Sequence, residues 1–288
     1  MTHNVDIVAR ISGLYGQLRD AEQKIAKLIL DDIDFAAHAT ISDLADRAGV
    51  SEATITRFAK AVDCKNVRDL KLKLAQSLAV GQRFYSDIKA EPAAAHGVYE
   101  AIKAALDHNA GLMTKKVINA AVACLSGART VLIFGVGGGS TVLASECQNR
   151  LFRLGVAATA YSDPMLMRMA AAVVDSNDLV LCLSLGGYSP DVQQAAEIAK
   201  EYGATVLAIT PAKTPLAKVA DQLVPIEPME TDYIFKPSAS RYVMLAAIDV
   251  LATELAVTQK RKTRERLRRI KLTLDQHKNG IDRLPLGD

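Results

Sequence analysis

The chain has 288 residues, of which half are hydrophobic and 23% are charged, and its formal net charge is +3. This length and composition allow a buried core and leave room for two domains. No apolar run reaches the roughly 18 residues that span a membrane, and the N-terminus lacks the pattern of a secretory signal. Because the four cysteines and five histidines are scattered, we expect no disulfide, metal site or cofactor, and a cytoplasmic protein.

The first 80 residues are predicted to form an all-α domain, because their apolar residues recur at the three- and four-residue spacing of helices. Two helices are expected before residue 40, and another is expected to begin near Val67. Between them, residues 41–61 fit two short helices joined by a tight turn at Gly49. Such a helix-turn-helix unit places its second helix in the major groove of DNA.

The second helix of this motif carries the candidate DNA contacts. At about 100° per residue, the face opposite its apolar side centres on Ala53, Arg57 and Lys60. Arginine can pair with guanine and alanine can touch the thymine methyl, whereas lysine and hydroxyl groups could equally contact phosphates. The predicted DNA-binding residues are Ser51, Ala53, Thr54, Thr56, Arg57 and Lys60. The alternative is a helical bundle without a DNA function, whose polar face is merely solvated.

Basic charge is concentrated around the same motif. Residues 47–73 carry seven basic and three acidic residues, whereas the rest of the first 80 residues carry four basic and eight acidic residues. The positive charge therefore lies near the expected groove-facing side, where the release of counterions from DNA requires it.

After a predicted linker at residues 81–97, the pattern changes to alternating strands and helices, predicted to form a second domain at residues 98–258. Short apolar runs bounded by glycine, proline or polar residues predict buried strands at 130–136, 178–185, 204–210 and 221–227, with a weaker candidate at 156–162. Helices are expected between them, at 140–154, 189–202 and 214–220. This alternation indicates an α/β domain with a doubly wound parallel sheet, which binds ligands at the carboxyl ends of its strands.

The loop FGVGGGS follows the strand predicted at 130–136 and leads into a helix. Gly137 and Gly139 allow the backbone to approach an anion closely, and Ser140 lies at the helix start, where free N–H groups attract negative charge. A dinucleotide-binding GxGxxG loop is the rival interpretation, but its third glycine position is Ser140 here. The sequence contains no GxxxxGK[ST] loop, which excludes that kind of nucleotide site.

The loop LSLGGYSPD follows the strand predicted at 178–185. Ser184 ends the strand, Gly186 and Gly187 form the turn, and Ser189 is placed to cap the next helix ahead of a proline. Hydroxyl and N–H groups would thus converge where a helix begins, without a lysine or a metal. Taken together, the two loops favour a phosphorylated ligand over the simpler interpretation that both serve only as helix caps.

These motifs resemble the RpiR family of bacterial regulators, which join an N-terminal helix-turn-helix to a C-terminal sugar isomerase (SIS) domain. The resemblance covers nearly the whole chain and rests on ISDLADRAGVSEATITRFAKA, IFGVGGGS, LSLGGYSPDV and AITPAKTPLAKVAD. The stretch SASRYVMLAAIDVLA is similar to the HexR-like branch, which senses 2-keto-3-deoxy-6-phosphogluconate. The resemblance implies a transcriptional regulator of carbon metabolism, a homodimer or homotetramer that binds an inverted-repeat operator in double-stranded DNA and a sugar phosphate effector.

The resemblance also carries over by position to the second domain. Ser140, Ser184 and Ser189 match hydroxyls that bind phosphosugars in SIS domains, but Gly186 stands where the usual loop has a second hydroxyl, so backbone N–H groups would replace it. Charge and a position just before the last helix add three residues that could reach a carboxylate. The predicted ligand-binding residues are Gly137, Gly139, Ser140, Ser184, Gly186, Gly187, Ser189, Lys236, Ser240 and Arg241.

Two other functions remain open. A phosphosugar isomerase would need a general base, and the candidates are Glu146, Glu227, Glu230 and His108, none in a recognisable constellation with the loops. A DNA-binding protein with a purely structural dimerisation domain is the other alternative. We expect no catalytic residue.

The last predicted element is a long helix that begins near Ser238 and continues into QKRKTRERLRRIKL. Residues 259–288, a predicted basic helix and tail, carry ten basic and four acidic residues. A solvated helix face, an arm near the DNA backbone and a subunit contact are all compatible with this charge.

Overall fold

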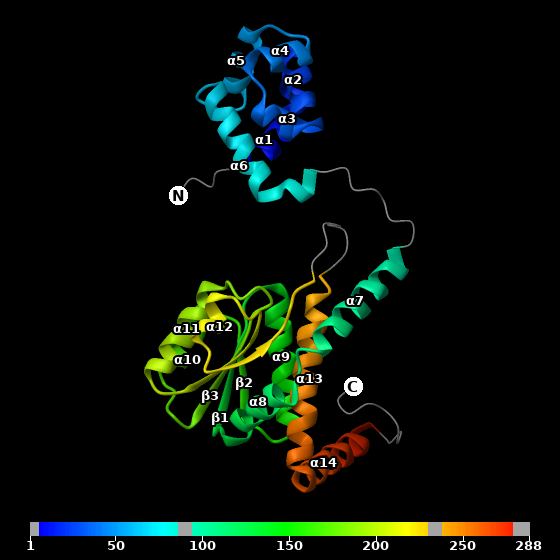
Figure 1. Cartoon of the computed structure of the whole chain (residues 1–288), viewed down its shortest axis with the longest axis vertical. Coiled ribbons are helices and arrows are strands. Elements are labelled where there is room, and N and C mark those ends of the chain that lie inside the picture. The colour runs from blue at the N-terminus through cyan, green and yellow to red at the C-terminus, as the bar shows by residue number, and fades with distance from the viewer. Residues whose placement is uncertain (1–5, 86–93, 230–237, 279–288) are drawn as a thin grey trace. The chain divides into compact units, whose positions relative to one another are not determined.

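The computed structural model describes residues 6–85, 94–229 and 238–278, and it is shown in Figure 1. The chain divides into two compact units at Ala90–Glu91, a helical unit and a unit that contains the sheet. The predicted fold classes of both are confirmed.

The first unit is all-α. Its helices are α1 (Ile7–Leu14), α2 (Asp20–Asp31), α3 (Ile33–His38), α4 (Ile41–Ala48), α5 (Glu52–Ala61) and α6 (Val67–Tyr85), with one turn of 3₁₀ helix at Tyr15–Gln17. The expectation of two helices before the motif was wrong, because α3 is a third. Asp32 separates α3 from α2, and its carboxylate accepts from the N–H of Phe35 to start the new helix. A helix of six residues is too short to show the apolar repeat on which the prediction depended.

One apolar core joins these helices. The fully buried side chains include Ile25 and Ile29 of α2, Phe58 of α5 and Leu70 of α6. Arg47 at the end of α4 pairs with Asp32 at 3.0 Å and lies over the ring of Phe35 at 4.1 Å. The motif α4–α5 therefore packs against α2, α3 and α6.

The second unit contains a parallel sheet of five strands. They are β1 (Thr130–Phe134), β2 (Ala158–Tyr161), β3 (Asp178–Leu183), β4 (Thr205–Thr210) and β5 (Gln222–Pro225), in the order β2-β1-β3-β4-β5. All five predicted strands are present. Val131 of β1 pairs with Ala158 of β2 on one side and with Leu179 of β3 on the other, and the register stays parallel throughout.

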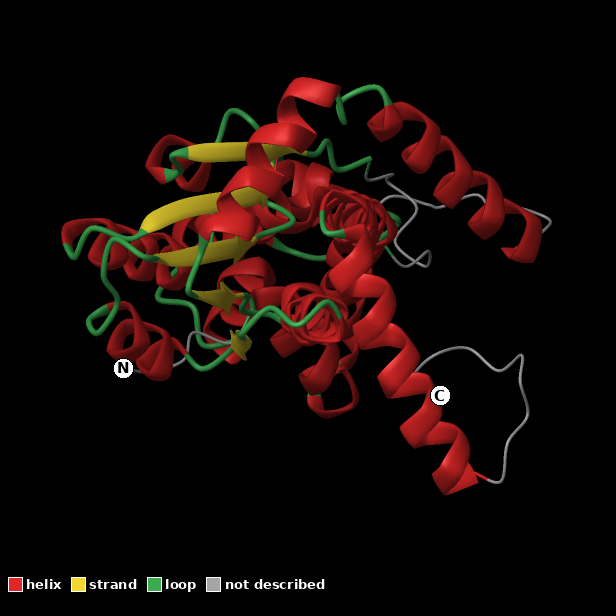
Figure 2. Cartoon of the chain, turned by 90° about the horizontal axis from the view of Figure 1, so that it is seen from below, coloured by secondary structure: helices red, strands yellow, loops and turns green. Residues whose placement is uncertain are grey.

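Helices cover both faces of the sheet, as Figure 2 shows. They are α7 (Ala94–Ala110), α8 (Lys115–Gly127), α9 (Gly138–Arg153), α10 (Pro164–Ala171), α11 (Pro190–Glu201), α12 (Pro215–Val219) and α13 (Ser240–Thr258). Alternate residues of β1 point to opposite faces, so that Val131 and Ile133 join the core with α8, α9 and α13, whereas Leu132 and Phe134 join the core with α10, α11 and α12. Two buried cores on one sheet explain why the strands are apolar throughout.

Two predicted segments differ in detail from the structure. The helices α6 and α7 extend into the predicted linker, to Tyr85 and from Ala94, and residues 86–93 lie outside the described part. The single long C-terminal helix was wrong, because α13 ends at Thr258 and α14 (Lys260–Lys278) leaves it at an angle of 109°. After the bend, Ile270 and Leu274 of α14 line a hollow together with Phe152 and Arg153 of α9.

Among the described residues, no single helix is both long enough and apolar enough to cross a membrane. The bent pair α13–α14 meets the length and composition criteria only when its two helices are taken together.

Candidate functional site

The strand order predicts a ligand crevice between β1 and β3. The chain leaves β1 for β2 on one side of it, and leaves β3 for β4 on the other side. The connections after these neighbouring strands therefore run in opposite directions, and we expect a ligand crevice at the carboxyl ends of the two strands. Both glycine loops follow these two strands, residues 135–140 after β1 and residues 184–189 after β3.

The loop after β1 offers open backbone and a hydroxyl. Gly137 has φ +91°, which favours glycine, and a Cβ atom placed on Gly137 or Gly138 would meet nothing within 4 Å. The helix α9 begins at Gly138, so its first N–H groups face this space. Ser140 is only 6% exposed, and its hydroxyl makes no hydrogen bond to any described residue.

The loop after β3 is braced by its own hydrogen bonds. The Oγ of Ser184 accepts from the N–H of Gly187 at 2.9 Å, and Thr210 donates its hydroxyl to the carbonyl of Ser184 at 2.9 Å. Gly187 has φ +74°, and a Cβ atom there would lie 2.4 Å from the Oγ1 of Thr214. Because Ser184 accepts from Gly187, its own hydroxyl hydrogen remains free to be donated to a ligand.

The two loops lie against each other. A Cβ atom on Gly139 would lie 2.9 Å from the Cδ1 of Leu185, so the first loop passes directly over this side chain of the second. Leu185 was not among the predicted residues, because only its packing against Gly139, 46 positions earlier in the chain, reveals it. Gly186, in contrast, has open space where a side chain would be.

Ser189 occupies the N-cap position of α11, but its side chain makes no capping hydrogen bond there. The expectation of a hydroxyl cap was therefore wrong in this respect, and Pro190 fixes the first turn instead. The hydroxyl of Ser189 remains half-buried at the rim of the loop without a partner among the described residues. Tyr188, the neighbouring residue, is 69% exposed, and no pattern in the sequence had indicated it as a candidate ligand-binding residue.

The remaining predicted ligand residues lie near the start of α13. Ser240 is its first residue and is almost fully buried, whereas Arg241 is exposed and its guanidinium lies 5.0 Å from the ring centroid of Tyr242. No described contact joins Arg241 to either loop. Lys236 lies outside the described residues.

The crevice suits an anion better than it suits catalysis. The candidate bases are engaged elsewhere, because Glu146 pairs with Arg150 at 3.0 Å and His108 pairs with Glu227; Glu230 lies outside the described residues. Burial raises the pKa of Cys147 and of Cys182 to about 12, so neither thiol is a nucleophile. No group of three metal-binding side chains occurs in the described part of the chain.

The helix-turn-helix has the expected local geometry. The hydroxyl of Thr40 accepts from the N–H of Asp43 at 3.1 Å, and the carboxylate of Asp43 accepts from the N–H of Thr40 at 3.0 Å. These two bonds form the capping box of α4. These bonds from Thr40 hold the pKa of Asp43 below its usual value. Gly49 ends α4 in the left-handed conformation, at φ 64° and ψ 44°.

Not all predicted DNA contacts are equally available on α5. Ser51, Ala53, Arg57 and Lys60 are exposed. Thr54 is buried at 7% exposure, and its hydroxyl binds Ser51 at 2.9 Å and accepts from Arg57 at 3.1 Å. Thr54 therefore positions its neighbours, and the structure contradicts its placement on the free face.

Thr56 is half-buried and donates its hydroxyl to the carbonyl of Glu52, one turn earlier in α5. Arg57 and Lys60 have no carboxylate partner among the described residues. The uncompensated positive charge of α5 thus lies on its exposed face.

Comparison with known proteins agrees with both halves of this geometry. The helix-turn-helix domain of the rpiR family matches residues 5–81, and the SIS domain matches residues 124–254. The transcriptional regulator HexR of Escherichia coli K12 is 33% identical over 288 residues, or 99% of each chain. HexR of Pseudomonas aeruginosa is 34% identical over 273 residues, which cover 93% of this chain and 95% of that protein.

A solved structure shows the same fold. The NanR protein of Vibrio vulnificus, complexed with ManNAc-6P, aligns with a TM-score of 0.60 at 21% identity and covers 94% of this chain and 98% of its own. The match to HexR extends over nearly the full length of both chains, and both domains occur in the expected order. The chain therefore belongs to the RpiR family of helix-turn-helix transcriptional regulators with a C-terminal SIS domain.

Proposed function

We propose that this regulator binds its operator through α5 and that a sugar phosphate in the crevice between β1 and β3 changes the affinity for DNA. The observation that carries the proposal is the convergence of both glycine loops at the one point where the strand order reverses. Oligomers of such proteins bring two reading helices to DNA, so we expect an inverted-repeat operator with half-sites about one helical turn apart or a multiple of it.

The donors available at the crevice suit a phosphate. The start of α9 supplies free N–H groups, Ser140 and Ser189 supply hydroxyls that no described residue binds, and Ser184 retains a hydrogen to donate. Charge-assisted hydrogen bonds of this kind hold an anion without a lysine or a metal. NanR of Vibrio vulnificus, which shares the fold, was solved with a sugar phosphate, which supports this ligand class.

For the effector itself, we propose 2-keto-3-deoxy-6-phosphogluconate. The similarity to HexR over nearly the whole chain favours this branch of the family. The compound also carries a carboxylate, for which Arg241 supplies positive charge in the first turn of α13, and Lys236 is a second candidate from the sequence alone. A ligand that binds one arrangement of the oligomer more tightly would shift DNA affinity by about 5- to 150-fold, for a coupling of about 1–3 kcal/mol.

The deciding experiment selects a binding sequence from random DNA with the full-length protein and measures its affinity with and without sugar phosphates. We expect 2-keto-3-deoxy-6-phosphogluconate to change the dissociation constant and to raise the melting temperature. If no sugar phosphate moves either quantity while DNA binding persists, the SIS domain is a structural dimerisation module. Turnover of a sugar phosphate by the purified protein would instead favour an isomerase.

The two halves of the proposal can be separated with one substitution. Arg57→Ala removes an exposed cation from the middle of α5, so we expect it to abolish preference for the selected sequence over random DNA. The same variant should keep the thermal shift with effector. Arg19→Ala, an exposed arginine at the start of α2, is the control of equal charge and should leave DNA binding unchanged. Unchanged specificity in Arg57→Ala would contradict the assignment of α5.

A further inference from the structure

A second basic surface lies on α14, which neither the crevice nor the reading helix uses. Residues 260–271 carry eight basic residues and a single acidic one. The acid, Glu265, binds Arg268 at 2.9 Å and lies 3.9 Å from Arg269. Four exposed cations then have no carboxylate partner among the described residues, namely Lys260, Arg261, Lys262 and Arg264. The first turns of α14 are thus strongly positive.

The helix α14 is fixed to the SIS domain. Arg266 donates to the carbonyl of Leu154 at the end of α9 and packs so closely on Gly155 that a Cβ atom there would lie 2.4 Å from its guanidinium carbon. Thr263, on the same side, is 5% exposed. These contacts fix the backbone of α14, and so the positions from which Arg261, Lys262 and Arg264 project into solvent, which lowers the entropy cost of binding a partner.

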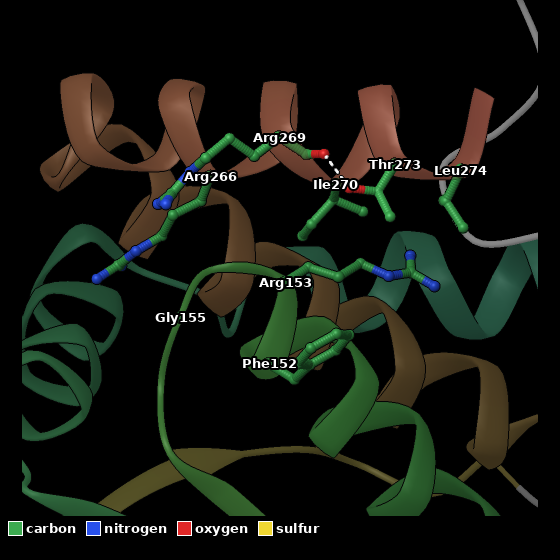
Figure 3. A pocket seen from close by; sticks show the side chains of 8 residues that line it. All are labelled: Phe152, Arg153, Gly155, Arg266, Arg269, Ile270, Thr273 and Leu274. Carbon is green, nitrogen blue, oxygen red and sulfur yellow. Dashed lines mark hydrogen bonds between the residues drawn. The ribbon is translucent and has the colours of Figure 1, made fainter. Parts of the chain in front are cut away.

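A hollow of about 440 Å³ separates the rest of α14 from α9 (Figure 3). Ile270 and Leu274 point from α14 toward Phe152 and Arg153 of α9. This side of α14 is therefore apolar and faces its own domain. A second, more polar hollow of about 550 Å³ lies along α14, and its lining is almost wholly cationic: Arg261, Lys262, Arg264, Glu265, Arg266, Arg268 and Arg269.

The length of the charged surface indicates the kind of partner. At 1.5 Å per residue, the segment from Lys260 to Lys271 is about 16 Å long, far longer than one phosphate group. Double-stranded DNA carries about one charge per 1.7 Å, so a duplex presents about nine phosphates over that length. A polyanion, and not a small metabolite, matches a row of cations of this extent.

We propose that the basic face of α14 binds the phosphate backbone of the DNA that α5 reads, an inference that rests on the proposed DNA-binding function. Both helices belong to one chain, so DNA held by α5 is presented to α14 at a high effective concentration. Contacts to phosphate add affinity and salt dependence but carry no sequence information. The C-terminal helix thus strengthens binding to every sequence equally, while α5 supplies the choice among sequences.

The test is the salt dependence of binding by the full-length variant Arg261→Gln/Lys262→Gln/Arg264→Gln, measured with the selected sequence and with a random duplex of the same length. Each phosphate contact contributes about −0.9 to the slope of log affinity against log salt. Loss of three contacts reduces the affinity change between about 50 and 200 mM salt by about 40-fold. We expect both duplexes to lose affinity by the same factor, with the preference for the selected sequence retained.

The matched control is Lys103→Gln/Lys115→Gln/Lys116→Gln, which removes three exposed lysines of α7 and α8 that form no ion pair with any residue in the described part of the chain. An equal fall in slope for both triple variants would overturn the proposal, since net charge alone would explain it. An unchanged slope in the α14 variant would overturn it too, as would a changed oligomeric state with an unchanged slope, which would assign this face to a second copy of the chain. If Arg57→Ala also leaves specific binding intact, the failure lies in the proposed function itself and not only in α14.

Discussion

The two glycine loops of the crevice follow neighbouring strands, yet they are built in different ways. The loop after β3 is tied internally, through the bonds from Gly187 and Thr210 to Ser184 and through the close packing of Gly187 on Thr214. The loop after β1 has open space around Gly137 and Gly138, and the hydroxyl of Ser140 makes no hydrogen bond to a described residue. Both loops are braced, since Thr141 donates its hydroxyl to the carbonyl of Gly135 in the loop after β1, but only the loop after β3 uses its serine hydroxyl for this purpose.

This difference separates stability from binding. Removing a hydroxyl that makes an internal hydrogen bond lowers the stability of the fold. Removing a hydroxyl without such a bond leaves the stability unchanged and affects only the binding of a ligand. Removing the Ser184 hydroxyl, which braces the loop after β3, should therefore affect both quantities, and removing the Ser140 hydroxyl should affect ligand binding alone. Three variants test this separation.

The largest effect is expected for Gly187→Ala. Its φ of +74° is unfavourable for alanine, and the new methyl group would lie 2.4–2.6 Å from the Oγ1, Cβ and Cγ2 atoms of Thr214. Strain and overpacking together should lower the free energy of unfolding by about 2–4 kcal/mol, as measured by urea denaturation.

The control for this variant is Gly186→Ala, one position earlier. A Cβ atom at Gly186 meets nothing within 4 Å and φ lies outside the left-handed region, so the stability should stay within about 1 kcal/mol of wild type. The methyl group would still enter the open crevice and weaken effector binding. Equal destabilisation by the two substitutions would mean that the loop after β3 is not braced against Thr214.

The sequence predicted the crevice but not how each serine is used. Five strands and the order of the motifs followed from apolar runs bounded by glycine, because buried parallel strands have a strong local pattern. The hydrogen bonds at Ser184 involve Gly187 and Thr210, which lie further along the chain. The hydroxyl of Ser189 makes no capping bond because of how α11 starts. A helical projection likewise placed Thr54 beside the free face of α5, although its hydroxyl is bound to Ser51.

The C-terminal region shows the same limit. One long helix was predicted from near Ser238 into the basic segment, yet the chain bends by 109° after Thr258. The bend is accompanied by the contact of Arg266 with Leu154 and Gly155, more than 100 residues earlier in the chain. Local propensity cannot encode a contact of this separation, and tertiary packing decides it.

An intermediate effect is expected for Ser184→Ala. The buried N–H of Gly187 would lose its acceptor, which should cost about 1–2 kcal/mol of unfolding free energy. The same change removes a donor to the ligand, so the dissociation constant of the effector should also rise. Calorimetry and urea denaturation on one preparation measure both quantities, and a variant that loses binding without losing stability would show that Ser184 does not brace the loop.

The smallest effect on stability, with a full effect on binding, is expected for Ser140→Ala. Its hydroxyl has no partner among the described residues, so the free energy of unfolding should match that of the wild type. Loss of a hydrogen bond to a charged phosphate should raise the dissociation constant of the effector by about 10- to 100-fold, as measured by calorimetry. The control on the same helix is Ser145→Ala, whose exposed hydroxyl donates to the carbonyl of Thr141 and lies further from the loop. If Ser140→Ala binds the effector as tightly as this control does, the Ser140 hydroxyl at the start of α9 does not bind the phosphate. The loop after β3 would then have to supply the side-chain donors alone.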